Sequence, residues 1–415
     1  MAAESGPDVA TTSDISSRPA RGVRVELPFG FTRREELGST LTTDEAGRVI
    51  ELLRVAFNGG PAWFAYGGDP VDHLLWKARD CPLHAHVTYH ERGDELVRFG
   101  WGIHRRYLVR GVERVVSDGG EAATLPELQG RGIYSKMRKL TREWGPRAGL
   151  DMSLGVSTHP AVLHNERNDT ARPPLGNNVR LFFRPLDLTR LQLLGGYGDE
   201  QDGPSNTSIA IAARRRRLPR PMWARRLAWR GRQFGASLRH RPYRGRQAGD
   251  WAIRTADSFD ARIDAFFEQA AQAFDLIQVR SAEYLNWRFC DPRSGPFVVR
   301  VAERDGRILG YCVLLTLESR PAIVDLLALP GRLDLVRSLV EDALAEFRRR
   351  GAAAVTLRTV ERHPHNEVLR RLGFLPRRAV AIASFRPIAI DAETTALLRD
   401  PACRVHLMYA DTDHV

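Results

Sequence analysis

The chain has 415 residues, a length that favours two domains over a single core. An apolar share of 43% and a charged share of 27% are typical of a soluble globular protein, and no segment approaches the roughly 18 apolar residues of a membrane-spanning helix. The net charge of +12 is confined to one segment. Of the 62 basic residues, 13 are arginines in the acid-free stretch 214–246, which leaves 49 basic against 50 acidic residues elsewhere.

The first residues and the cysteines indicate the compartment. Residues 1–22 are rich in Ser, Ala, Pro and Asp, so we expect a disordered leader and no signal peptide. The four cysteines are far apart and form no C-x-x-C pair, which predicts reduced, mostly buried thiols in a cytoplasmic protein. They are Cys81, Cys290, Cys312 and Cys403. We expect no metal site, since the pair His363-x-His365 has no partner cluster.

Residues 23–195 form the first predicted domain. An acidic first turn and apolar residues at helical spacing predict a helix over 42–57. Residues 84–126 contain three strand-like runs, and a helix over 132–149 and a strand over 150–157 follow. Turn residues interrupt the runs at Arg92-Gly93-Asp94, Arg110-Gly111 and Asp118-Gly119-Gly120. The order predicts a small antiparallel meander that leads into a strand–loop–helix–strand unit.

Residues 196–250 form a predicted linker, and residues 214–246 within it carry the 13 arginines. A helix here would place Trp223, Leu227 and Phe234 on one face among the arginines. We favour a linker helix that packs between the domains. Two alternatives remain open, which are contact with the phosphates of a nucleic acid and peripheral association with an anionic membrane. Elsewhere lysine is rare, with only Lys77, Lys136 and Lys139, a bias that we attribute to genomic composition.

Residues 251–415 form the second predicted domain and repeat the plan of the first. Helical patterns precede strand patterns, and a long helix then a further strand follow, so the shared order suggests a tandem duplication. The patterns cover 259–274 and 281–289 (helices), 297–318 and 322–329 (strands), 333–352 (helix) and 354–360 (strand). The aromatic residues Tyr284, Trp287 and Phe289 have the spacing of ordinary helix packing.

Residues 125–140 read LPELQGRGIYSKMRKL and carry the main chemical signal. Glycines between a strand and a helix let successive N–H groups turn toward one point, which with the helix dipole makes an anion site suited to a diphosphate. The loop lacks the third glycine of a dinucleotide fingerprint and the Lys-Ser/Thr of a P-loop.

This loop resembles the acetyl-coenzyme A loop of the GNAT acyltransferases, with the pattern Q/R-x-x-G-x-G/A. Gln129, Gly132 and Tyr134 fall on the first, fourth and sixth positions, although Tyr134 replaces the usual Gly or Ala. The motifs EYLNWRF, ERDGRILGYCVLL, RLGF and HLMYADTDHV resemble the second half of bacterial tandem-GNAT proteins. The likeness covers roughly 350 residues. It implies an α/β fold of two tandem GNAT-like domains, each a mixed, mostly antiparallel sheet flanked by helices.

The resemblance also implies an acyl-CoA co-substrate, most simply acetyl-CoA. Its pantetheine arm would pair with the strand edge before the loop, with Thr124 and Leu125 nearest the thioester. The cofactor-binding residues would be Thr124, Leu125, Gln129, Gly130, Arg131, Gly132, Ile133, Tyr134, Ser135 and Lys136. Glu121 is the candidate base, with Glu127 as the alternative. In the GNAT family a Tyr after the next strand usually acts as the general acid that protonates the departing thiolate. That Tyr is absent here, so His164 and Tyr134 are the candidates for this role.

The second domain has no counterpart to the loop, so we expect it to bind no coenzyme. The predicted function is acyl-CoA-dependent transfer, with an acyl group other than aminoacyl, to a primary amine. The acceptor is a small molecule, a sugar or a peptide. The alternative is a non-catalytic protein of this fold that binds nucleic acid, an anionic membrane or a partner through residues 214–246.

Overall fold

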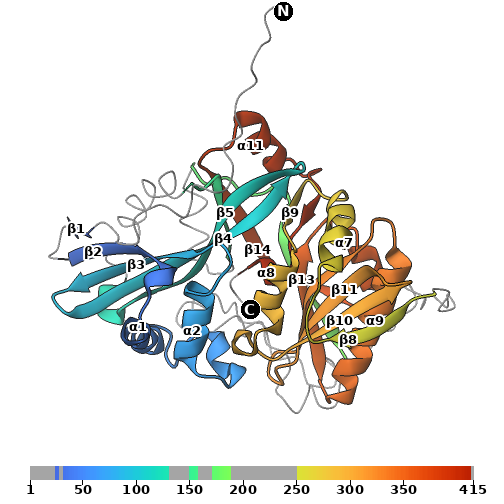
Figure 1. The fold of residues 1–415 in the computed structure, drawn as a ribbon, viewed down its shortest axis with the longest axis horizontal. Helices are drawn as coiled ribbons and strands as arrows, with labels where there is room; N and C mark the ends of the chain where they lie inside the picture. Colours follow the sequence, from blue (N-terminus) through green and yellow to red (C-terminus); the bar gives the residue numbers. More distant parts are fainter. Residues whose placement is uncertain (1–23, 28–30, 130–148, 158–170, 188–249, 413–415) are drawn as a thin grey trace, which may run out of the picture.

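The chain is an α/β protein in which helices flank one large, mostly antiparallel sheet, as expected (Figure 1). The structure is a computed structural model, and it describes residues 24–27, 31–129, 149–157, 171–187 and 250–412. Among these residues no helix has the length and apolarity to span a membrane. The predicted leader and the arginine-rich segment 214–246 lie outside them.

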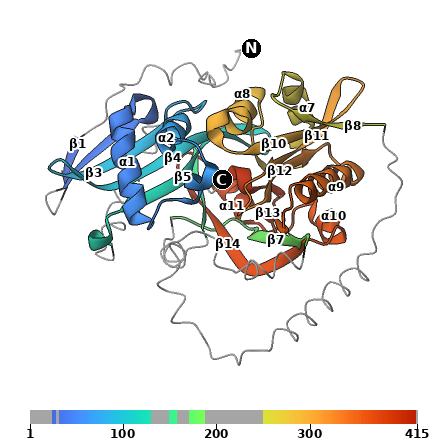
Figure 2. The same ribbon diagram turned by 90° about the horizontal axis from the view of Figure 1, so that it is seen from below.

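The first half forms the predicted meander. Its elements are β1 (Arg24–Leu27), β2 (Phe31–Leu37), α1 (Thr43–Ala56), α2 (Pro70–Ala78), β3 (Ala85–Arg92), β4 (Glu95–Val109), β5 (Val112–Thr124), β6 (Met152–Ser157) and β7 (Val179–Pro185). Strands β1 to β5 pair in sequence as antiparallel neighbours. Thr42 and Glu45 form a capping box that starts α1. Helices α1 and α2 cover the apolar face of β3 and β4 (Figure 2).

One of the three predicted interruptions of the meander is wrong. Gly93 and Arg110-Gly111 have positive φ and form the turns between strands, as expected. Asp118, Gly119 and Gly120 instead lie within β5, which continues along β4 to Thr124 with one register shift. Their turn-forming composition reflects a bulge in the strand, described below, instead of a chain reversal.

The second half contains its own series of helices and strands. Its elements are β8 (Ala252–Ala256), α7 (Arg262–Ala271), β9 (Leu276–Gln278), α8 (Ala282–Leu285) with a π turn (Asn286–Cys290), β10 (Phe297–Arg304), β11 (Arg307–Leu315), β12 (Ala322–Ala328), α9 (Leu333–Arg349), β13 (Ala354–Val360), α10 (Asn366–Arg371), β14 (Leu375–Pro387), α11 (Ala392–Arg399) and β15 (Val405–His406). Alternate residues of β11 face opposite cores. Tyr311 and Val313 pack on the α7 side, and Cys312 and Leu314 pack on the α9 side.

The two halves exchange strands at their junction. The sheet runs in the order β1-β2-β3-β4-β5-β6-β14-β7-β13-β12-β11-β10-β8. β7 from the first half is thus hydrogen-bonded between β13 and β14 of the second half, and β14 pairs with β6 of the first. The predicted domain boundaries at 195 and 251 remain a prediction. The exchange adds that residues 179–185 belong to the sheet of the second half.

Candidate active site at the divergence of two strands

The strands β5 and β6 run side by side as parallel neighbours for only three residue pairs. The register extends from Val116–Met152 to Asp118–Leu154. Beyond it β5 continues to Thr124 along β4, and β6 continues to Ser157 along β14, with no further pairing between β5 and β6 in the described residues. We call this place the first divergence and Asp118 its vertex. The edge of β5 that faces β6 presents its backbone over residues 119–124.

A β-bulge lies in β5 just beyond the vertex. Gly100 pairs with Ala122 and Gly102 pairs with Gly119, so two residues of β5, Gly120 and Glu121, lie opposite the single residue Trp101. A bulge bends its strand and disrupts the ladder, and bulges are frequent next to active sites. The backbone of the candidate base Glu121 is therefore at the bend, while its side chain lies outside the described part of the structure.

The strand end leads directly into the predicted diphosphate loop. The Leu125 N–H donates to the Val97 carbonyl at 3.0 Å, which holds the end of β5 against β4. The exposed Gln129 folds back, and its Nε2 donates to the Thr124 carbonyl at 2.9 Å. Glu127 is exposed in a short 3₁₀ turn after Pro126. The structure thus places Thr124, Leu125 and Gln129 together at the open end of the divergence.

The other predicted site residues lie outside the described residues. They are Gly130, Arg131, Gly132, Ile133, Tyr134, Ser135, Lys136 and His164. Their roles therefore stay predictions from the sequence.

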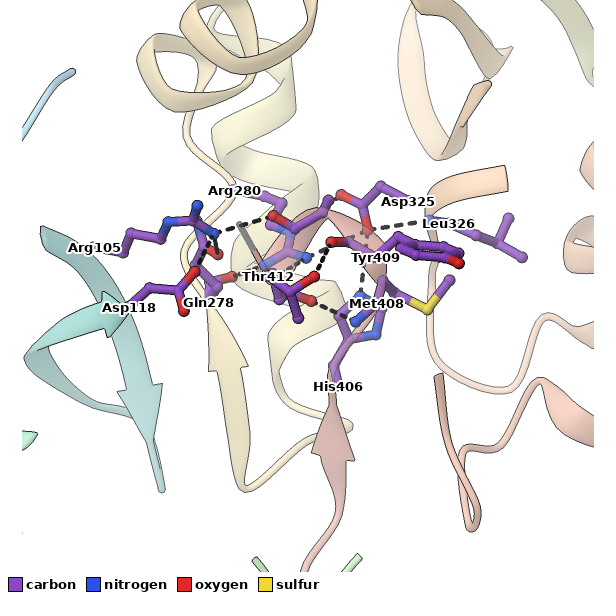
Figure 3. A network of polar contacts seen from close by, with 12 residues as sticks. Arg105, Asp118, Gln278, Arg280, Asp325, Leu326, His406, Met408, Tyr409 and Thr412 are labelled. Atoms are coloured by element: carbon purple, nitrogen blue, oxygen red, sulfur yellow. Dashed lines mark hydrogen bonds and ion pairs between the residues drawn. The ribbon is translucent and has the colours of Figure 1, made fainter. Parts of the chain in front are cut away.

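A buried ion pair lies at the vertex (Figure 3). Asp118 is 2% exposed, and its Oδ2 is 3.4 Å from Nη1 of Arg105 on β4. The same Arg105 nitrogen donates to the Ala410 carbonyl at 3.0 Å and to Gln278 Oε1 at 3.3 Å. Arg105 therefore connects the vertex to β9 and to the last described segment of the chain.

A second buried arginine continues this network into the second half. Arg280 contacts Asp411 at 2.6 Å and Asp325 at 3.3 Å, and all three side chains are at most 1% exposed. The Tyr311 hydroxyl also donates to Asp325 at 2.7 Å. Burial alone would raise the pKa of the Asp325 carboxyl, but Arg280 and His406 hold this pKa well below its ordinary value.

Histidines extend the network behind Asp325. The backbone N–H of His365 donates a hydrogen bond to Nδ1 of the His363 ring. The proton of the neutral His363 ring is therefore on Nε2, which donates to Nδ1 of His406 at 3.0 Å. The remaining nitrogen of His406, Nε2, lies 3.6 Å from Asp325 Oδ1. Burial lowers the pKa of His363 well below its ordinary value and, with His406, lowers that of His365 to about 3. Both rings are therefore neutral near pH 7.

The strands β12 and β13 of the second half also diverge. Their parallel register covers only Ala322–Thr356 and Ile323–Leu357. Here the chain's own segment 405–412 lies between them, because Met408 bridges to Thr359 of β13 and the 3₁₀ turn 409–411 packs against both strands. We call residues 405–412 the C-terminal segment, and each of them is at most 3% exposed.

The remaining residues singled out in the second half have structural roles. Tyr284 and Phe289 are buried in the core under α7, as their spacing predicted. Trp287 stacks on Trp76 of α2 with ring centroids 4.9 Å apart, and each indole N–H donates to the backbone carbonyl of the other residue. This pair joins the two halves. No group of three or more His, Cys, Asp or Glu side chains in the described ranges is arranged to hold a metal ion.

Sequence reasoning missed the network at the vertex. Asp118 was interpreted as a turn residue, and Arg105 is one of many arginines. The available signal was the alternation of β4. Because Phe99, Trp101 and Ile103 are buried on one face of that strand, Arg105 must continue this face, and an arginine there requires a buried acid.

Comparison with known proteins identifies the fold. No family model and no curated protein match the sequence. The Saccharomyces cerevisiae N-myristoyltransferase with bound myristoyl-CoA and inhibitors is 15% identical, covers 93% of this chain and 86% of that chain, and has a TM-score of 0.55.

Two bacterial structures are also similar. A GCN5-related N-acetyltransferase from Kribbella flavida is 14% identical over 89% of this chain and 74% of that chain, with a TM-score of 0.52. A protein of unknown function from Enterococcus faecalis V583, described as a probable N-acyltransferase, is 11% identical over 86% and 73%, also with a TM-score of 0.52. The chain therefore has the fold of these N-acyltransferases, which is the fold that its loop motif implied.

Proposed function

We propose that the chain is an acyl-CoA-dependent N-acyltransferase whose first half binds the coenzyme. The observation that carries this proposal is the first divergence, because the edge of β5 that has no β6 partner among the described residues leads directly into the loop Gln129-Gly130-Arg131-Gly132. A strand edge for an extended arm and a glycine loop for a diphosphate are the two binding elements that a coenzyme A molecule requires. Myristoyl-CoA bound to the similar yeast structure supports the same assignment.

The strand geometry supports one direction for the arm. Residues 119–124 span about 20 Å at roughly 3.3 Å per residue, which accommodates an extended pantetheine chain. Since the diphosphate would bind the loop at the open end, the thioester would lie toward the vertex, near Gly119 and Gly120. This differs from the arrangement expected above, because Thr124 and Leu125 would then contact the diphosphate end of the arm.

The reaction follows from this placement. The acceptor amine would attack the thioester carbonyl directly in a ternary complex, and the thiol of coenzyme A would leave. We retain Glu121 at the bulge as the candidate base, which would contribute roughly 10²–10⁴-fold. His164 and Tyr134 remain the candidates for protonating the thiolate. The acyl group would be acetyl, and the acceptor would be a primary amine of a small molecule, a sugar or a peptide.

The second half would bind no coenzyme. Its divergence contains the C-terminal segment, which Arg280 holds through Asp411 at 2.6 Å. Its helix α9 follows a loop with one glycine, Gly331, and begins without a side-chain cap. The pantetheine arm of a coenzyme could enter this divergence only if the C-terminal segment moved out from between β12 and β13. We therefore propose one coenzyme site in each chain.

Calorimetric titration of the whole protein with acetyl-CoA tests the proposal. We expect one site per chain in the wild type and no binding in Gly132→Glu, since the added carboxylate would repel the diphosphate. Gly331→Glu in the second half is the matched control and should bind normally. A second site would contradict the assignment of the second half. Absence of binding to acetyl-CoA and to longer acyl-CoAs would contradict the whole proposal.

A further inference from the structure

A row of polar residues crosses the sheet at the vertex, on the face away from α1 and α2. The strand registers place His86 of β3 opposite Gly102 of β4, and His104 of β4 opposite Ser117 of β5. The residues of β4 between these positions pack against α1 and α2, so the row lies on the other face. Ser117, His86 and His104 are 5%, 9% and 8% exposed. Buried polar groups therefore lie beside the vertex, on the strands that carry the edge of β5.

Gly102 lets the His86 ring reach toward β5. A Cβ on Gly102 would lie 2.9 Å from His86 Nε2, and closer still to His86 Cε1 and to Ser117 Oγ. His86 Nε2 and Ser117 Oγ are therefore neighbours over the backbone of Gly102. On its other side, the His86 ring is oriented by a hydrogen bond between its Nδ1 and Nε2 of His104, which are 3.1 Å apart.

The space next to this serine is open. Gly119 lies on the same face, two residues after Ser117 and opposite Gly102. It is exposed, and nothing in the described part of the structure lies within 4 Å of the position that its Cβ would take. Positions two residues apart along a strand are about 7 Å apart, so a group placed over Gly119 borders the Ser117 hydroxyl. The proposed function puts the thioester at this place.

The two histidines provide polar surroundings without charge. Burial, followed by His104 and Arg33, lowers the pKa of His86 well below its ordinary value, and burial lowers the pKa of His104 to about 4. Both rings are neutral near pH 7, so each has one nitrogen that donates and one that accepts a hydrogen bond. Separated charges in buried surroundings are costly, so such a place favours a proton that moves between neutral groups.

We propose that the Ser117 hydroxyl carries the proton of the attacking amine to the leaving sulfur of coenzyme A. As the amine nitrogen bonds to the thioester carbon, Ser117 Oγ accepts a proton from that nitrogen. As the C–S bond breaks, its electron pair goes to the sulfur, which takes the hydroxyl proton of Ser117. The amide and the free thiol form, and the serine is restored.

This relay requires no separate acid, in a chain that lacks the usual Tyr of the GNAT family. His86 would orient the Ser117 hydroxyl through its Nε2. The inference rests on the proposed function, because it requires the thioester to lie over Gly119. It assigns a catalytic role to a residue that the loop motif does not include.

Single-turnover transfer from acetyl-CoA tests the relay. The release of free thiol is followed with a chromogenic disulfide, with alkylamines, amino sugars and a peptide with a free N-terminus as acceptors, and with water alone. Ser117→Ala should release the thiol about 10²-fold more slowly than the wild type, with an unchanged affinity for acetyl-CoA by calorimetry. Small buffer acids should restore part of the rate in Ser117→Ala and leave the wild-type rate unchanged, since they can protonate the sulfur in place of the serine.

Thr88→Val is the matched control. Thr88 lies on the same face of β3, two residues after His86, and is 8% exposed, so this change also removes a buried hydroxyl. It should keep the wild-type rate. A Ser117→Ala rate equal to that of this control would overturn the role of Ser117.

The other outcomes separate the two proposals. Absence of acetyl-CoA binding by the wild type would contradict the proposed function itself. Binding without thiol release above the uncatalysed rate would overturn only the role of Ser117. If Ser117→Ala does not fold, as judged by its thermal unfolding, wild-type rates in mixtures of light and heavy water decide the question. A relay moves two protons in one step, so the rate should depend on the square of the deuterium fraction, and a linear dependence would overturn the inference.

Discussion

Arg280 is expected to be the most costly charged residue to remove. Arg280→Met deletes a guanidinium that lies 2.6 Å from Asp411 and 3.3 Å from Asp325, and both carboxylate side chains are fully buried. Breaking a buried pair leaves an uncompensated charge, which costs about 3–5 kcal/mol. That is a large part of the roughly 5–15 kcal/mol that stabilises a typical domain. Urea unfolding monitored by circular dichroism measures the loss.

The pH dependence of this loss has a definite sign. In the wild type the pKa of Asp325 is lowered, so its contribution to stability is present above the unfolded pKa and is lost as the pH falls through the folded value. In Arg280→Met the guanidinium no longer opposes burial, so the pKa of the Asp325 carboxyl rises above its value in the wild type. Asp325 then takes up a proton as the pH falls, which removes part of the penalty. The difference between the two proteins should therefore narrow from about pH 8 to about pH 5.

Arg254→Met is the matched control. Arg254 pairs with Glu303 at 2.7 Å, but its side chain is 47% exposed, so its removal should cost less than about 1 kcal/mol. A loss in Arg280→Met as small as in this control, or a loss that does not change with pH, would refute the argument.

The remaining predictions concern packing, and urea unfolding tests each of them. Trp287→Ala removes the stack on Trp76 and both indole hydrogen bonds between the halves, so we expect a loss of about 3–5 kcal/mol; a loss below about 1 kcal/mol would contradict this. Gly176→Ala should destabilise the protein strongly, because a Cβ would lie 2.2 Å from the backbone of Asp400. Gly47→Ala in α1 should instead stabilise it by up to about 1 kcal/mol, since nothing lies within 4 Å; equal effects of the two glycine changes would contradict this reasoning.

The elements that the sequence predicted well are those with a local pattern. The acidic first turn of α1, the apolar period of α9 and the strand patterns of β10 and β11 are each readable within one element. The resemblance of the loop to the coenzyme loop of the GNAT acyltransferases likewise implied an open strand edge just before the loop, and β5 ends there beyond its short pairing with β6. In each case the residues that determine the structure are neighbours in the sequence.

The features that the sequence did not predict depend on distant residues. Asp118-Gly119-Gly120 has the composition of a turn, and only the pairing with β4 shows that it lies within a strand and runs into a bulge. The network of Arg105 and Arg280 joins residues separated by up to 305 positions. The alternation of β4 indicates that Arg105 is buried, but no local pattern identifies its partners, which had to be located in space.

The strand exchange makes the structures of the two halves depend on each other. β6 has β5 on one edge and β14, from the second half, on the other. The first divergence therefore has one wall, β6, whose position depends on a strand that lies more than 200 residues further along the chain. Arg105 adds a second dependence, since it binds both Asp118 at the vertex and the carbonyl of Ala410. A first half expressed alone would lack both supports, so the second half would hold the proposed coenzyme site in shape even though it binds no coenzyme in this proposal.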